Sequence, residues 1–282
     1  MHPKLLPDVA VSAILWLLQA STGSAPALEL DRNIIYPCEP LLLTISNYKL
    51  SPSEPVRLAV AGESFNEDIQ IPGVMWIANE KQGKIFTVLC GDYAKNRYIF
   101  RDAGKYSISL RTGATTNSTS LTVLEANMSE LAAYESIGPK LFPLLFLDSW
   151  RSEPHAELVK ACTSISKQFP GTSCARYCDG YLAVAEFKSA LKVHDTTGGK
   201  NVYQPIADRL LRCLTALEDG NSYSGQLPFF YAYALTLSGE DRAALQFLEK
   251  ALSVRPTPWF PLLEKLKSEI ASDQAPPGAR TG

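Results

Sequence analysis

Residues 227–258 read LPFFYAYALTLSGEDRAALQFLEKALSVRPTP, and this stretch decides the fold expected for the C-terminal half of the chain. Apolar and small side chains recur at helical spacing on both sides of Gly239, which is placed to turn the chain. Ala232, Ala244 and Ala251 are small enough to let two helices approach closely. The stretch therefore predicts two antiparallel helices joined by a tight turn.

This pair of helices resembles one tetratricopeptide repeat that ends at Pro256, with Pro228 where the family usually has an aromatic residue. The surrounding sequence predicts further helices, because its apolar segments are separated by Pro- and Gly-containing breaks. We expect helices at residues 154–169, 173–192, 203–218, 226–237, 240–253 and 258–271. The resemblance implies a tetratricopeptide-like α-helical repeat domain over 153–271, and the Pro- and Gly-rich residues 272–282 predict a disordered tail.

The N-terminal half, residues 28–126, has short apolar runs separated by turn signals, which is the pattern of β-strands. We expect strands at residues 28–33, 41–47, 56–61, 73–78, 84–89, 97–100, 105–110 and 120–124. Asp102, Gly104 and Tyr106 form an Asp-x-Gly-x-Tyr run that resembles the tyrosine corner of immunoglobulin-like domains, a folding device in which the Tyr hydroxyl bonds to the backbone. Ile108 stands where antibody-type domains have a cysteine. The resemblance implies an immunoglobulin-like antiparallel β-sandwich without the usual disulfide.

A junction at residues 127–152 is expected to connect the two parts, so the predicted fold class is multidomain, β then α. Its apolar residues Leu144, Leu145, Phe146 and Trp150 are expected to pack the domains together or to cap the helices; an exposed binding patch is the alternative.

Residues 1–27 have the pattern of a signal peptide. Lys4 gives a weakly positive start, residues 9–18 form a compact apolar run, and Ala25-Pro26-Ala27 is a small-residue cleavage pattern. A buried N-terminal helix is the alternative, because Asp8 is unusual before such a run. The run is too short to span a bilayer, and no later segment is long and apolar enough, so no transmembrane span is expected in the mature chain. The prediction is export to the periplasm or beyond.

The charge balance argues against nucleic-acid binding. The 282 residues carry 27 basic and 29 acidic side chains, a formal net charge of −2, without a Lys/Arg-rich run. Binding to phosphate backbones depends on a concentrated basic surface. No cofactor is expected either, because Gly198-Gly199-Lys200 lacks the first Gly and the Ser/Thr of a phosphate-binding loop.

Six cysteines are the residues most suggestive of chemistry. They are Cys38 and Cys90 in the first half and Cys162, Cys174, Cys178 and Cys213 in the second. Export makes disulfides plausible, with Cys38–Cys90, Cys162–Cys178 and Cys174–Cys213 as candidate pairs; small buried thiols are the alternative. The spacing lacks the paired C-x2-C knuckles of zinc sites. Neither His155 nor His194 lies in a motif that would orient it as a base for a catalytic thiol.

Four aromatic residues on one helix suggest a binding surface. Phe229, Phe230, Tyr231 and Tyr233 cannot all be buried in a two-layer stack, so some of them are expected to line a groove for a peptide, with core packing as the alternative. As a whole, the chain resembles exported bacterial proteins in which an immunoglobulin-like domain precedes a helical-repeat domain. The sequence therefore predicts a non-enzymatic scaffold or adaptor that binds a protein or peptide. An enzyme or enzyme inhibitor with its site at the sandwich loops or the domain junction is the alternative.

Overall fold

The computed structural model describes most of the chain from residue 26 to residue 274. The described ranges are 26–47, 57–63, 66–70, 76–79, 84–92, 95–112, 115–147, 153–197, 202–219, 224–253 and 259–274. The expected signal peptide, except for its last two residues, lies outside them, as do Trp150 and residues 275–282 of the expected tail.

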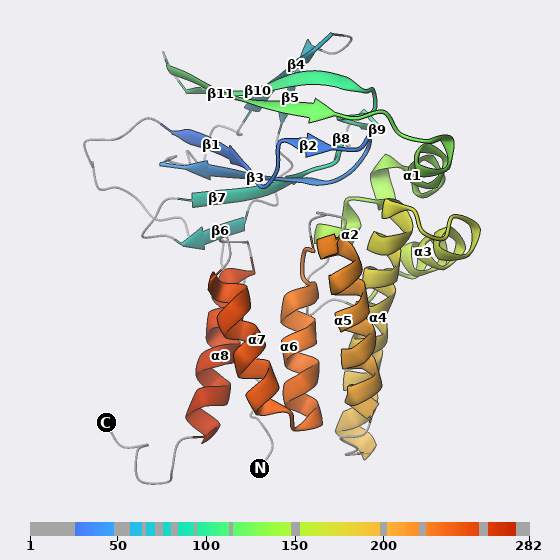
Figure 1. Ribbon diagram of the computed structural model, residues 1–282, viewed down its shortest axis with the longest axis vertical. Coiled ribbons are helices and arrows are strands. Elements are labelled where there is room, and N and C mark those ends of the chain that lie inside the picture. The colour runs from blue at the N-terminus through green and yellow to red at the C-terminus, as the bar shows by residue number, and fades with distance from the viewer. Residues whose placement is uncertain are drawn as a thin grey trace.

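The described strands of the N-terminal half form three sheets, and Figure 1 shows their arrangement. The first is antiparallel and has the order β1 (Ala27–Leu30), β3 (Leu41–Ser46), β7 (Lys84–Leu89) and β6 (Trp76–Asn79). The second has the order β2 (Ile34–Ile35), β11 (Thr115–Val123), β10 (Gly104–Thr112), β4 (Arg57–Gly62) and β5 (Asn66–Gln70). The third pairs β8 (Gly91–Asp92) with β9 (Arg97–Tyr98).

The helical half follows the strands in the sequence. The described residues contain eight helices. They are α1 (Met128–Leu141), α2 (Leu144–Leu147), α3 (Ala156–Gln168), α4 (Ser173–Thr197), α5 (Tyr203–Asp219), α6 (Leu227–Ser238), α7 (Asp241–Ser253) and α8 (Phe260–Gln274). From α3 to α8, each helix packs against the next in the sequence, and Figure 1 shows α4 to α8 standing side by side below the sheets. In the part of the chain that the structure describes, no helix combines the length and the apolar character needed to cross a bilayer.

The β3 strand is buried on both faces, and this sets the layering of the molecule. Leu41, Leu43 and Ile45 belong to a core that also contains residues of the second sheet, such as Leu58 and Ile108. Leu42, on the opposite face of β3, belongs with Phe86 of β7 to the core of the helices. Side chains alternate along a strand, so the sheet containing β3 is the middle layer, between the other large sheet and the helices.

The predicted fold class is wrong. The chain is a mixed α/β structure with sheets of two to five strands, mostly before the helices, and it does not have the immunoglobulin-like antiparallel sandwich. The five-stranded sheet is itself mixed, because β2 runs parallel to β11. One face of the four-stranded sheet is covered by helices, whereas an antiparallel sandwich commonly leaves its outer faces exposed to water.

The helices do not repeat a single unit along the chain. Their lengths are unequal: α4 has 25 residues and α6 has 12. The local pair α6–α7 does form, and Gly239 joins it in the left-handed conformation at φ 89°. Ala232, Ala244 and Leu248 are fully buried there. Good local helix signals therefore do not make the helical half a repeat domain.

The Asp-x-Gly-x-Tyr run forms a corner at the start of β10. The Tyr106 hydroxyl donates a 2.9 Å hydrogen bond to the backbone oxygen of Asp102, and Gly104 has a positive φ of 148°. The Tyr106 ring packs against Gly62, where a Cβ atom would lie 2.8 Å from the ring. The corner holds β10 against its neighbour β4 and does not contribute a reactive group.

Candidate functional site

An aromatic cluster joins the strands to the first helices. Tyr98 of β9 meets Tyr134 of α1 edge to face, with ring centroids 6.0 Å apart, and its hydroxyl donates a 2.6 Å hydrogen bond to the Tyr134 backbone oxygen. Phe142 contacts both rings and also reaches Tyr177 of α4, with centroids 5.8 Å apart. Edge-to-face pairs of this kind add stability beyond the area that they bury. Burial raises the pKa of both tyrosines at the junction, Tyr98 and Tyr134.

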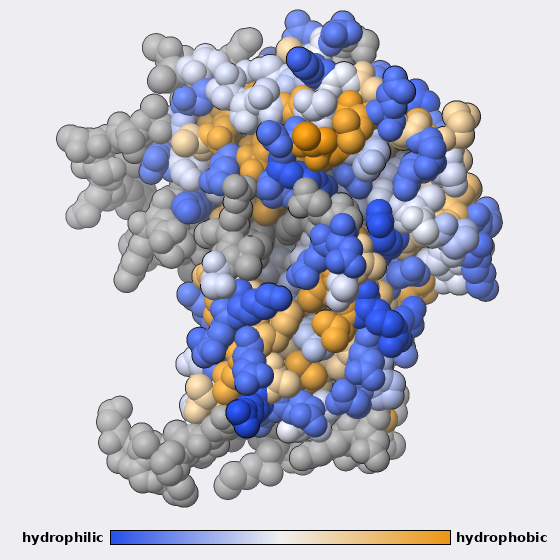
Figure 2. All heavy atoms as spheres, viewed as in Figure 1, coloured by the Kyte–Doolittle hydropathy of each residue, from blue (hydrophilic) through white to orange (hydrophobic). Residues whose placement is uncertain are grey.

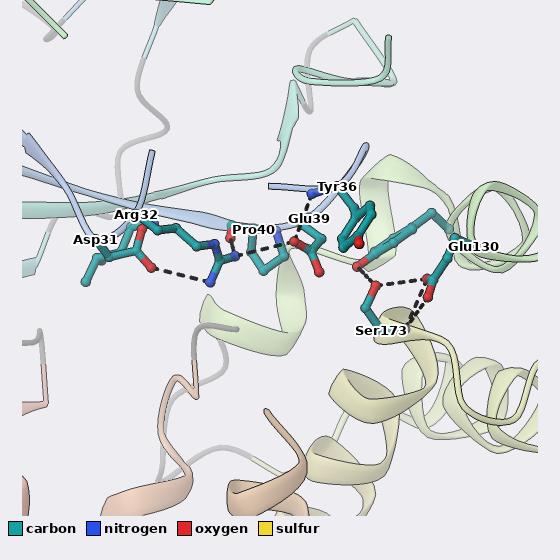
Figure 3. A network of polar contacts seen from close by, with 9 residues as sticks. Asp31, Arg32, Tyr36, Glu39, Pro40, Glu130 and Ser173 are labelled. Atoms are coloured by element: carbon teal, nitrogen blue, oxygen red, sulfur yellow. Dashed lines mark hydrogen bonds and ion pairs between the residues drawn. The ribbon is translucent and has the colours of Figure 1, made fainter. Parts of the chain in front are cut away.

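A polar cluster surrounds the first turn of α4 (Figure 3). The carboxylate of Glu130, on α1, accepts hydrogen bonds of 2.9 and 3.0 Å from the backbone N–H of Ser173 and one of 2.9 Å from its hydroxyl. The Ser173 oxygen lies 2.9 Å from the Tyr134 hydroxyl. Since the serine proton is given to Glu130, the tyrosine is the donor to Ser173. A carboxylate at a helix N-terminus accepts hydrogen bonds from the free N–H groups and is attracted to the positive end of the helix dipole.

A second set of charges lies in the strand half beside this cluster. The Arg32 guanidinium donates a 2.5 Å hydrogen bond to the Pro40 oxygen and lies 3.6 Å from Asp31 and 3.9 Å from Glu39. The side chains of Arg32 and Glu39 are each only 6% exposed. Glu39 accepts a 3.1 Å hydrogen bond from the Tyr36 N–H. Figure 3 shows both sets in one view, along the boundary between the strands and the helices.

Burial is the main influence on the pKa values of the two carboxyl groups in this second set. It raises the pKa of Asp31, although Arg32 and the Leu42 N–H act in the opposite direction. Burial also raises the pKa of Glu39 against the effect of Arg32. Each of these charged groups has its partners within the protein, and Arg32 also interacts with Tyr177 of α4, so the set links the strands to the helices.

Three thiols form a buried cluster between α3 and α4. Cys162, Cys174 and Cys178 are fully buried, and Cys178 accepts hydrogen bonds from the other two. These bonds lower the pKa of Cys178 and raise the pKa of its two neighbours. The hairpin therefore brings Cys162 beside Cys178, as the sequence predicted, but as thiols.

All six cysteines lie in the described part of the chain, and each is a free thiol in the structure. Cys38 and Cys90 belong to the core that joins the strands to the helices, and burial raises the pKa of each to about 12. Cys213 lies apart from Cys174, in the lining of a separate cavity. Among the described residues, no group of three or more His, Cys, Asp or Glu side chains is placed to hold a metal ion.

That cavity opens between α4 and α5 and has a volume of about 280 Å³. It is lined by Arg176, Asp179, Arg209, Arg212, Cys213 and Ala216. Arg209 of α5 forms an ion pair with Glu186 of α4. Burial and Asp179 raise the pKa of Cys213 to about 11, outweighing the two nearby arginines, so the thiol is neutral at neutral pH and is a weak nucleophile.

The four aromatic residues predicted to bind a partner divide into two pairs. Phe229 and Phe230 are buried, and Phe230 packs against Phe187 of α4 with centroids 5.5 Å apart. Tyr231 and Tyr233 are half-buried; Tyr231 meets Phe247 of α7 edge to face at 4.7 Å. Figure 2 shows hydrophobic residues reaching the surface among the helices on the face of the molecule that it displays.

The histidines do not complete a catalytic group. His155 is exposed at the start of α3, whereas the thiols of α3 and α4 are buried; the side chain of His194 lies outside the described residues. Sequence reasoning missed the arginine-lined cavity, because Arg176 lies 33 positions before Arg209 in the sequence. The local signal was Arg209 and Arg212, which are three residues apart and so share a helix face.

No protein-family model matches the chain, and no curated protein matches it significantly.

Proposed function

We propose that this protein is an exported, non-enzymatic scaffold or adaptor that binds a protein or peptide partner through its helical half. The observation that carries the proposal is the cavity between α4 and α5, which is open to a partner and lined by three arginines. Arginine is over-represented in protein interfaces, where its planar guanidinium makes directional hydrogen bonds. Half-buried Tyr231 and Tyr233 on α6 add aromatic surface of the kind that interfaces use.

The strand half would support this surface. Tyr98 ties β9 to α1, and Glu130 and Tyr134 of α1 in turn hold Ser173 at the N-terminus of α4. A binding surface on a rigid element loses less entropy when the partner binds.

An enzyme or inhibitor site at the junction has less support. The junction does contain a tight polar set, but Ser173 is only 1% exposed and its hydroxyl is held between Glu130 and Tyr134. A substrate could reach that oxygen only if the layers separated. Arg32 and Glu39 are likewise buried against each other.

The test is affinity capture with the purified full chain from an extract of the cell envelope, followed by direct calorimetric titration of each captured protein. We expect at least one captured protein to bind the purified full chain in titration. A fragment of that protein should compete with it for the same site on the chain. Turnover of a small substrate, without any partner that binds in titration, would overturn the proposal.

A further inference from the structure

The charge of the α4–α5 cavity suits one anionic group. Arg176, Arg209 and Arg212 contribute three positive charges and Asp179 one negative charge, which leaves two. Glu186 pairs with Arg209 and reduces the total to about one. A single carboxylate would balance that charge, whereas a phosphate, with a charge between −1.5 and −2 at neutral pH, would exceed it.

One donor in the lining has no partner of its own. The Nε atom of Arg176 is buried and makes no hydrogen bond within the described part of the chain. An unsatisfied buried N–H is costly, and a guanidinium offers its donors in a planar fork that matches a carboxylate.

The size of the cavity favours a single acidic side chain over a larger ligand that contains a carboxylate. Its volume of about 280 Å³ lies below the range of about 300–1,000 Å³ in which drug-sized ligands bind. It is large enough for one acidic side chain. The rest of the partner would then lie outside the cavity, over the surfaces of α4 and α5.

We propose that this cavity binds the carboxylate of an Asp or Glu side chain in an acidic segment of the partner. The inference rests on the proposed function and names the chemistry of the partner. Arg176 and Arg212 donate to the carboxylate, Arg209 is shared with Glu186, and Asp179 sets an upper limit on the negative charge that the cavity accepts.

The probe is a fluorescein-labelled peptide, Gly-Ser-Asp-Glu-Asp-Ser-Gly, capped at both ends. Its neutral twin, Gly-Ser-Asn-Gln-Asn-Ser-Gly, controls for the backbone. We expect fluorescence anisotropy to show binding of the acidic peptide to the full chain, weakening as salt is raised, and at least about tenfold weaker binding of the twin. Equal binding of the two peptides would overturn the proposal.

The variants assign the binding to the cavity. Arg212→Gln should weaken binding of the acidic peptide about tenfold or more, because it removes a charged donor. Arg242→Gln makes the same change on exposed α7 and should leave the affinity unchanged. Asp179→Asn should strengthen binding severalfold, because it removes the negative charge from the lining; a variant that merely misfolds cannot do this. Unchanged affinity in both Arg212→Gln and Asp179→Asn would overturn the proposal.

Two further outcomes separate this proposal from the proposed function. Inorganic phosphate that competes with the peptide at equal or lower concentration than glutarate would overturn the carboxylate assignment. A captured partner that binds the wild-type chain and Arg212→Gln equally well would support the adaptor function. It would contradict the proposal that this partner binds in the cavity. Weaker binding of that partner to Arg212→Gln, but not to Arg242→Gln, is the expected result.

Discussion

The Tyr98 hydroxyl donates a 2.6 Å hydrogen bond to the backbone oxygen of Tyr134, and it thereby ties a strand residue to the middle of α1. The donor is buried and comes 36 positions earlier in the chain than the acceptor. We predict that Tyr98→Phe lowers the free energy of unfolding by about 1–2 kcal/mol, because a buried hydrogen bond is lost with little change in packing. Urea unfolding measures the change. Tyr36→Phe, at a side chain that is 47% exposed, is the control and should change stability little.

Glu130 holds the N-terminus of α4 from outside that helix. We predict that Glu130→Gln destabilises the folded chain by about 1–3 kcal/mol, because a charged acceptor facing the helix N-terminus is replaced by a neutral amide. Glu125→Gln removes the same charge at an exposed position before α1 and should cost less than about 0.5 kcal/mol. Thermal and urea unfolding of the two variants provide the comparison, and equal losses would contradict the capping role.

The buried carboxyl of Glu39 makes stability depend on pH. Burial raises its pKa in the folded chain above the value in the unfolded chain. The folded chain therefore binds a proton that the unfolded chain releases, so this contribution is greatest below the ordinary pKa and is lost as pH rises through the raised pKa. We predict that Glu39→Gln removes this loss: its stability at pH 7 relative to about pH 4.5 should exceed the same difference in the wild-type chain.

Urea titrations at both pH values measure that difference for each chain. The comparison does not depend on any uniform destabilisation that the substitution causes. Glu218→Gln, at an exposed position on α5, should follow the wild-type pH dependence. A Glu39→Gln chain with the same pH dependence as wild type would contradict the raised pKa.

Thiol reactivity should separate Cys213 from the other cysteines. Cys213 is partly exposed, whereas the other five are buried. At about pH 8 we expect Ellman's reagent to modify Cys213 slowly, because its pKa of about 11 leaves little thiolate, and to modify the others only after unfolding. Cys213→Ser should abolish the slow reaction. Fewer than six reactive thiols in the unreduced, denatured chain would show instead that some of the cysteines pair as disulfides.

The helices were the most predictable part of the fold. Gly239 and the break at Pro170-Gly171 placed the ends of the helices around them, because these residues interrupt apolar periodicity locally. Gly138 and Pro139, residues that usually interrupt a helix, lie inside α1 and kink it, with Gly138 at φ 79° and the helix continuing to Leu141.

The layering of the sheets and the candidate site could not be predicted from local sequence patterns, because both depend on contacts between residues far apart in the chain. The parallel pairing of β2 with β11 joins residues almost 90 positions apart, and a two-residue strand carries no periodic signal. Leu41-Leu42-Leu43 did contain a hint, since an uninterrupted apolar strand is buried on both faces. The arginine-lined cavity depends on how α4 aligns with α5, which the spacing within either helix does not determine.

The core that passes from Phe86 and Tyr98 into the helices has a consequence for synthesis. A ribosome makes the strands first, so one face of the middle sheet has no cover until α1 and α4 have emerged. A nascent chain stalled after residue 126 would present that apolar face to chaperones. The helices thus complete the folding of the strands that precede them, and the two halves mature together.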